Sequence, residues 1–112
     1  MATAFADEAV RLRDDAHLSD DLLSRGTGAA PSTVRDWFAR RSNPTGVRAE
    51  RLVELSAIVD RLTRVMDADF IPVWLMRPIE ALDDEKPVDV VGRGDYRRVA
   101  RLVSALEDPG AV

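Results

Sequence analysis

Apolar residues recur at spacings of three and four along most of this chain, and alternation of apolar and polar residues is almost absent. Spacings of three and four place side chains on one face of an α-helix, whereas strict alternation is typical of a half-buried strand. The pattern predicts helices over residues 5–16, 20–25, 31–41, 47–66, 70–76, 87–91 and 95–107, with a turn or short helix at 78–82. We therefore expect an all-α protein.

The boundaries of the second and third predicted helices are marked by residues that suit helix ends. Ser19 is a favourable N-cap, because its hydroxyl can accept a hydrogen bond from the first turn. Gly26 and Gly28 interrupt the helix that follows. Pro31 suits the first position of the next helix, where its missing N–H would have no partner anyway. Residues 19–41 are thus predicted to be two short helices joined by a glycine turn.

The longest predicted helix, residues 47–66, is apolar on more than one face. Val53, Ile58 and Val65 lie beside a continuous apolar stripe. An arc this wide exceeds what a helix at the surface of a monomer needs. Because so small a chain has little to cover the second side, we expect a homodimer whose contacts come from the stripe residues Leu52, Leu55, Val59, Leu62 and Met66.

Composition removes several classes of chemistry. The 112 residues contain no cysteine and a single histidine, His17. Disulfides, thiolate zinc sites and thiol nucleophiles are therefore excluded, and we expect neither a metal nor a cofactor. No apolar run approaches the roughly 18 residues that span a bilayer, and the first residues lack a signal-peptide pattern. These features predict a cytoplasmic protein that does not bind membranes.

No set of residues resembles a catalytic constellation. The adjacent acids at 83–85 are expected to splay into solvent as part of a hydrated loop. His17 lies near Asp14 and Ser19, but three residues at one helix end cannot converge as base, orienter and nucleophile. We therefore expect a protein that is not an enzyme and has no small-molecule substrate.

Charge is unevenly distributed along the chain. The net charge is −4, which argues against strong non-specific binding to phosphate backbones, yet residues 25–51 carry six arginines against two acids. In a helix-turn-helix, the second helix presents its N-terminal residues to the major groove. The candidate DNA contacts are Ser32, Thr33, Arg35, Asp36, Arg40 and Arg41. Because Asp36 would repel phosphate, a helical hairpin with solvated arginines is an equally open interpretation of residues 19–41.

The second half of the chain carries a series of ordered landmarks. Trp74-Leu75 is followed by Pro78, then by Leu82, by the run Pro-Val-Asp-Val-Val at 87–91, and by Gly94 before an arginine-bearing helix. This order resembles the toxin-binding domain of Xre/MbcA/ParS-type antitoxins, which follows a helix-turn-helix in that family. The resemblance covers about residues 18–108.

The resemblance implies two regions and a function. Residues 1–46 would form an N-terminal helical lobe containing the helix-turn-helix-like segment 19–41. This lobe would pack, through the long central helix, on a toxin-binding lobe at 47–112 with a flexible C-terminal tail. The protein would be the antitoxin of a type II toxin–antitoxin system whose partner is a RES-domain toxin that degrades NAD. The resemblance also allows it to bind its own operator.

The family's toxin-binding mode implies particular contact residues. The C-terminal end is expected to lie over the toxin's active site, with the arginines of the last helix and the preceding turn as further contacts. Trp74 and Leu75 are instead expected to belong to the core. The candidate toxin contacts are Arg93, Arg97, Arg98, Arg101, Glu107, Asp108, Pro109, Gly110, Ala111 and Val112.

An alternative from another functional class is left open by the residues. In that interpretation the chain is a stand-alone helix-turn-helix transcriptional regulator, and its C-terminal lobe serves only to dimerise. A neighbouring gene for a RES-domain protein would favour the antitoxin over the regulator.

Overall fold

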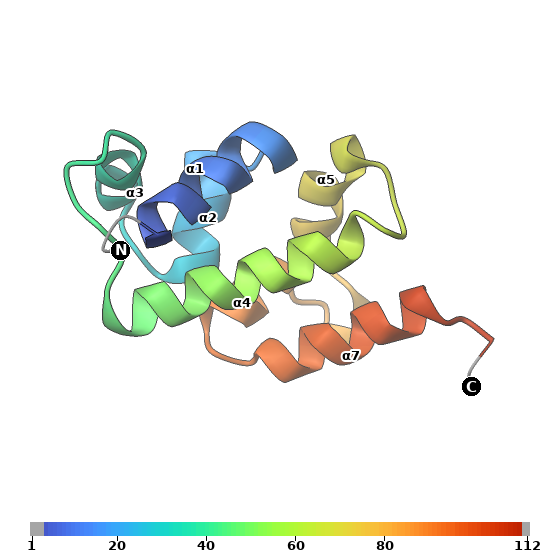
Figure 1. Ribbon diagram of the computed structural model, residues 1–112. Helices are drawn as coiled ribbons and strands as arrows, with labels where there is room; N and C mark the ends of the chain where they lie inside the picture. Colours follow the sequence, from blue (N-terminus) through green and yellow to red (C-terminus); the bar gives the residue numbers. More distant parts are fainter. Residues whose placement is uncertain (1–3, 111–112) are drawn as a thin grey trace.

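The computed structural model describes residues 4–110, and within them the protein is built from helices joined by short turns (Figure 1). The only extended pairing in this part of the chain is an isolated bridge between Ile79 and Glu85. The prediction of an all-α fold is confirmed. In chain order the elements are α1 (Ala4–Ala16), α2 (Asp20–Thr27), α3 (Pro31–Phe38), α4 (Gly46–Leu62), η1 (Ala68–Phe70), α5 (Ile71–Leu75), η2 (Glu80–Leu82), α6 (Pro87–Gly92) and α7 (Tyr96–Glu107).

Helix α4 forms the centre of the molecule. It contacts α1 and α2 on one side and α6 and α7 on the other, so that it lies between the first and last thirds of the chain (Figure 1). Its side chains Leu55 and Ile58 are fully buried in a core that also contains Leu12 and Val99 from the flanking helices. The two predicted regions therefore share one hydrophobic core.

This arrangement overturns the predicted dimer contacts. Leu52, Leu55, Val59 and Leu62 are at most 1% exposed within a single chain, and Met66 is half-buried against the same core. The wide apolar arc was interpreted as the mark of a second subunit. Apart from Val53, which is 48% exposed, the arc is instead covered by helices of the same chain. The five stripe residues therefore cannot be a free dimer surface.

Some of the predicted helix boundaries in the first half of the chain are confirmed and others are wrong. Gly26 lies inside α2 and does not interrupt it, and α3 ends at Phe38, before the predicted end at residue 41. Three of the predicted end signals hold. The Ser19 hydroxyl accepts a hydrogen bond from the backbone N–H of Leu22 at 3.2 Å. Gly28 closes α2 in the left-handed conformation, with φ of 80°, which glycine adopts without steric cost. Pro31 begins α3.

Helix α4 is shorter than the sequence pattern predicts. It ends at Leu62, and the N–H of Arg64 bonds the carbonyl of Arg61, an i to i+3 bond that tightens the last turn. The pattern extended the helix because Val65 and Met66 still pack against the core from this turn. Apolar spacing alone does not distinguish such a tightened turn from another helical turn.

Gly92 allows a close contact between α6 and α2. A Cβ atom at this position would lie 1.9 Å from the backbone carbonyl oxygen of Arg25. The predicted helix over residues 87–91 ended just before Gly92, whereas in the structure Gly92 is the last residue of α6. Glycine is required here because any side chain would meet the backbone of α2. Backbone atoms cannot move aside as the end of a flexible side chain can.

We therefore predict that Gly92→Ala lowers the free energy of unfolding by about 2 kcal/mol or more, because the new methyl group forces α6 away from α2. Urea denaturation monitored by circular dichroism measures the effect. Gly110→Ala is the matched control, since nothing lies within 4 Å of a Cβ there, and its stability should equal that of the wild type. Equal stability of the two variants would contradict the close contact.

Candidate functional site

The C-terminal end of α7 is held by an arginine from α4. The Arg61 guanidinium donates hydrogen bonds to both carboxylate oxygens of Glu107, at 3.1 and 2.5 Å, and to the hydroxyl of Ser104 at 2.9 Å. Arg61 is more than 40 positions away in sequence from both Ser104 and Glu107. Two-point contact between a guanidinium and a carboxylate fixes orientation as well as distance. We call this set of contacts the Arg61 clamp.

The clamp changes the titration of Glu107. The hydrogen bond from Arg61 lowers the pKa of Glu107 below its usual value, and the same bond raises the pKa of Arg61. At neutral pH both groups are therefore charged and paired. Glu107 was predicted as a toxin contact, and the structure places its carboxylate within the protein's own clamp.

The tail begins directly after this clamp. Asp108, Pro109 and Gly110 follow α7 and are exposed, while the predicted toxin contacts Ala111 and Val112 lie outside the described residues. In Figure 1 the chain leaves the end of α7 and projects away from the rest of the molecule. The tail thus starts from a fixed point and has no helix of this chain packed over its first three residues.

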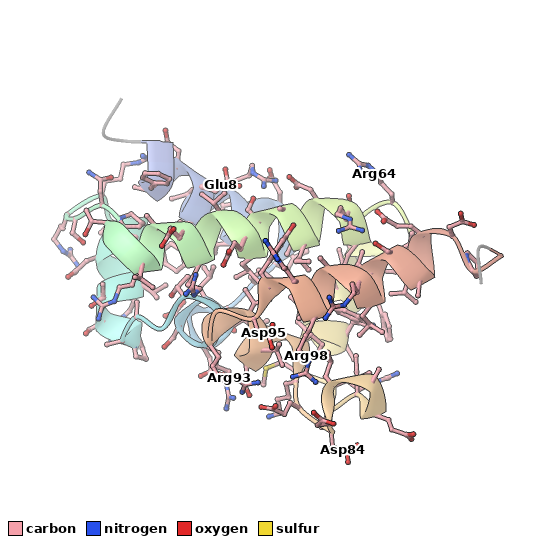
Figure 2. The ribbon with its side chains drawn as sticks, turned by 90° about the horizontal axis from the view of Figure 1, so that it is seen from below. Glu8, Arg64, Asp84, Arg93, Asp95 and Arg98 are labelled. Carbon is pink, nitrogen blue, oxygen red and sulfur yellow. The ribbon has the colours of Figure 1, made fainter. Side chains whose placement is uncertain are left out.

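The predicted arginine contacts separate into two groups. Arg93 pairs with Glu85, and Arg98 pairs with Asp83 and Asp95. Figure 2 shows Arg93, Asp95 and Arg98 near one another at the start of α7. The other two predicted contacts, Arg97 and Arg101, are exposed and have no carboxylate within 4.0 Å in the described part of the chain. They are the cations of α7 that remain available to a partner.

A hollow of about 260 Å³ lies between η2 and α7. Its apolar lining comes from Ala81, Leu82, Leu102 and Ala105, and its charged lining comes from two of the predicted contacts, Arg98 and Arg101. An apolar hollow beside guanidinium groups suits an apolar side chain next to a carboxylate. The sequence predicted the arginines of this site and a turn or short helix at 78–82, but it did not indicate that η2 forms the opposite wall of the hollow.

Residues 70–75 divide between core and surface. Trp74 and Leu75 are 7% and 0% exposed, so the prediction that they belong to the core is confirmed. Phe70 and Val73 are exposed, and the Arg77 guanidinium lies 5.3 Å from the centre of the Phe70 ring. These two exposed apolar side chains were not predicted as site residues, because helical spacing alone did not indicate which side of so short a helix faces outward.

The buried and exposed sides of α3 agree with the pattern of apolar and polar residues in segment 19–41. Val34 and Trp37 are buried, while Ser32 and Arg35 are exposed on the other side of α3 and Thr33 is partly so. In Figure 1, α3 stands at the end of the molecule opposite the C-terminal tail.

The candidate DNA-contacting arginines are all paired with acids. Arg35 lies 3.7 Å from Asp20, Arg41 lies 3.1 Å from Asp36, and Arg40 contacts Asp7 of α1. The sequence segment 25–51 carries an excess of positive charge, but acids from α1, α2 and α3 approach most of it in the folded chain. The local potential is therefore weaker than the segment's composition indicated.

Residues 4–110 contain neither a cluster of metal-ligating side chains nor a helix that could span a membrane. No three histidine, aspartate or glutamate side chains in this range lie close enough to hold a metal ion. None of its helices combines the length and the apolar character needed to cross a membrane.

Comparison with known proteins gives the family. No family model matches the chain. The mycobacterial cidal antitoxin MbcA of Mycobacterium bovis and that of Mycobacterium tuberculosis are each 35% identical to it over 80 residues, which is 71% of this chain and 71% of each relative. The chain belongs to the MbcA family of antitoxins. Membership in the MbcA family agrees with the resemblance seen in residues 74–94.

A solved structure extends the likeness to nearly the whole chain. The crystal structure of the M. tuberculosis MbcT–MbcA toxin–antitoxin complex contains a chain that matches with a TM-score of 0.80 and 29% identity, covering 96% of each chain. The helical arrangement is thus that of a family member crystallised with its toxin. The match includes the N-terminal helices as well as the landmark-bearing second half.

The clamp should depend on pH in a defined direction. Because the folded pKa of Glu107 is below the usual value of 4.5, the clamp is complete above that value and is lost as the pH falls through the lower folded value. We predict that the backbone amide resonances of residues 104–108 and of Gly110 shift in this acidic range in NMR titrations. At neutral pH, Glu107→Gln should already show the amide resonances that the wild type shows at acidic pH, because its side chain carries no charge. A titration of the variant identical to that of the wild type would contradict the clamp.

Proposed function

We propose that this chain neutralises a RES-domain, NAD-degrading toxin of a type II toxin–antitoxin pair by binding it directly, with its C-terminal end over the toxin's active site. Family membership supports an antitoxin role, and the related M. tuberculosis protein occurs in a complex with the toxin MbcT. The proposal requires no reaction by this chain, because covering a pocket is sufficient to stop the partner enzyme.

The observation that carries the proposal is the Arg61 clamp at the origin of the tail. A flexible segment that orders on binding loses conformational entropy, and this loss weakens affinity. The clamp holds the last turn of α7 through Glu107 and Ser104, so the following residues start in one direction before any partner is present. Asp108 then contributes a negative charge, which suits a pocket that binds the pyrophosphate of NAD with positive groups.

The cations of α7 provide a second point of attachment. Arg97 and Arg101 belong to the helix that carries the tail, and Arg98 and Arg101 border the hollow between η2 and α7. A toxin surface that offers a carboxylate beside an apolar side chain would fit this hollow. Two separate contacts on the same rigid helix would fix the position of the tail relative to the toxin.

A double-mutant cycle tests the tail and its clamp together. We predict that deleting residues 108–112 raises the concentration of antitoxin needed for half-inhibition of the toxin by about tenfold or more, with the fold unchanged. Arg61→Ala should give part of this loss in the full chain and almost none in the truncated chain, because it acts through the tail. Inhibition is measured by NAD consumption with purified toxin.

The variants also separate the possible failures of this proposal. Arg61→Lys, which retains one hydrogen bond and the charge, should recover part of the inhibition. Undiminished inhibition after the deletion would remove the tail from the mechanism. A loss caused by Arg61→Ala that is equally large in the truncated chain would show that Arg61 supports the fold and does not direct the tail.

Operator binding is a second candidate function, and the exposed N-terminal part of α3 favours it. Ser32 and Arg35 face outward from a helix whose other side is buried, and α3 is far from the proposed toxin contacts (Figure 1). A chain with both surfaces could bind its operator and its toxin at once. The acids beside the arginines predict weak, salt-sensitive binding. This proposal differs from the stand-alone regulator, which would have no toxin partner.

For the DNA contacts, we predict that Arg35→Ala with Arg40→Ala lowers affinity for the operator by about tenfold and flattens its salt dependence. Inhibition of the toxin should be unchanged, because α3 is not part of the proposed toxin contacts. Fluorescence anisotropy with an operator duplex at several salt concentrations measures the effect. Unchanged anisotropy curves would remove α3 from DNA recognition.

A further inference from the structure

The C-terminal end of α3 carries an arginine in an unusual backbone conformation. Arg40 has a φ of 59°, in the left-handed region that glycine adopts freely and that other residues adopt at a cost. Its N–H bonds the carbonyl of Trp37, and the N–H of Arg41 bonds the carbonyl of Asp36. These two bonds form a Schellman motif, in which glycine is the usual residue at the position that Arg40 occupies. The backbone therefore does not explain why this residue is an arginine.

The side chain of Arg40 contacts another helix. Its guanidinium donates a hydrogen bond to the carboxylate of Asp7 in α1, which is 33 positions away in sequence. The two side chains are 51% and 53% exposed. Ion pairs exposed to this extent contribute little to stability. The pair with Asp7 therefore offsets little of the cost of the left-handed conformation.

Helix α1 is fixed beside this end of α3. The Arg13 guanidinium lies 4.6 Å from the centre of the Phe38 ring, and the two helices pack against each other. On its other side α1 is anchored in the core by Ala9 and Leu12, which are fully buried. The Asp7 carboxylate is thus held near Arg40 by a packed helix and not by a mobile segment.

A carboxylate paired with an arginine uses the same N–H donors that a DNA phosphate would use. Two of the candidate DNA contacts meet acids from other helices in this way. Arg35 lies 3.7 Å from Asp20 of α2, which is beyond hydrogen-bond distance, whereas Arg40 donates a hydrogen bond to Asp7. Asp7 is therefore the stronger competitor for a phosphate.

We propose that α1 limits the affinity of α3 for DNA, with the Asp7 carboxylate occupying Arg40 in place of a backbone phosphate. This inference rests on the operator binding proposed above and names a residue that regulates it. A phosphate must displace Asp7 to reach Arg40, so binding exchanges one ion pair for another. Arg40 stands at a glycine position because its guanidinium contacts DNA, and the fold bears the cost of the backbone strain.

The contact with Asp7 affects all DNA sequences alike. Phosphate contacts position a protein on the duplex but carry no sequence information. Weakening such a contact lowers the affinity for every duplex, and it leaves discrimination to side chains that reach the bases. The acid in α1 thus shortens the time that the chain stays on DNA outside its operator.

Removing the acid tests the proposal directly. Asp7→Asn frees Arg40 and nearly preserves the size of the side chain. We expect it to bind about threefold more tightly, both to a duplex from the DNA upstream of the gene and to a scrambled duplex. The salt dependence should also become steeper, because Arg40 no longer gives up an acid when it binds phosphate. Fluorescence anisotropy at several salt concentrations measures both effects.

Asp69→Asn is the matched control for the change in net charge. Asp69 is exposed in η1, which directly precedes α5, and α5 and α3 lie at different ends of the molecule in Figure 1. Salt at about 0.1 M screens charges that are more than roughly 10 Å apart. Asp69→Asn should therefore bind both duplexes as the wild type does. An increase equal to that of Asp7→Asn would overturn the proposal.

A double-mutant cycle shows whether Asp7 acts through Arg40. In the Arg40→Ala background, Asp7→Asn should leave the affinity for DNA unchanged, because the arginine that the acid occupies is absent. An equal gain in both backgrounds would show that the acid repels DNA from a distance, and this result would overturn the proposal.

Arg40→Gly distinguishes a DNA contact from a structural residue. Glycine removes the left-handed strain, so we expect this variant to unfold at a higher urea concentration than Arg40→Ala and at no lower a concentration than the wild type. Its affinity for DNA should fall as much as that of Arg40→Ala. A variant that is less stable than the wild type would show that Arg40 supports the fold, and would overturn the proposal.

The results also separate this inference from the operator binding on which it rests. Binding by the wild type that Asp7→Asn does not strengthen would overturn the role of α1 and leave operator binding standing. An absence of binding by both proteins at low salt would overturn the two together. Circular dichroism of each variant checks that its helices are intact.

Discussion

The structure depends on the burial of α4 from two opposite sides. A helix of 17 residues is about 25 Å long, and this one supplies the contact surface for α1 and α2 as well as for α6 and α7. Since all four flanking helices pack on the same element, their positions are set relative to one another. The helix that carries the tail and the helices that precede α3 are placed by one shared core.

The distribution of ion pairs limits how the surface can act. The chain is acidic overall, and most arginines lie beside carboxylates of the same chain, including the candidate DNA contacts at Arg35, Arg40 and Arg41. Exposed pairs of this kind contribute little to stability, but they reduce the charge that a partner encounters. Within the described residues, Arg97 and Arg101 on α7 are among the cations that have no such neighbour.

The sequence predicted the helices well because their signals are local. Apolar spacing defined the buried faces, and Ser19 and Pro31 marked two helix starts. It failed where the answer depended on distant parts of the chain. The spacing of apolar residues in α4 does not show what covers them, so intramolecular burial was interpreted as a dimer interface.

The candidate site shows the same limit. The arginines of α7 could be named from the sequence, but their partners could not. Arg61 meets Glu107 across 46 positions, and the acids that approach the 25–51 segment come partly from outside it. Contacts between side chains far apart in sequence become visible only when the packing of α4 is known.

The close approach at Gly92 has a consequence for how this protein could change over time. Arg25 of α2 presents its carbonyl to Gly92 and its guanidinium to Asp89 of α6, at 3.1 Å. The N-terminal helix α2 and the C-terminal helix α6 therefore fit each other through a direct backbone contact. Replacing the N-terminal or the C-terminal half with that of another protein would break this fit. New partners are therefore expected to evolve through surface substitutions and not through exchange of whole halves.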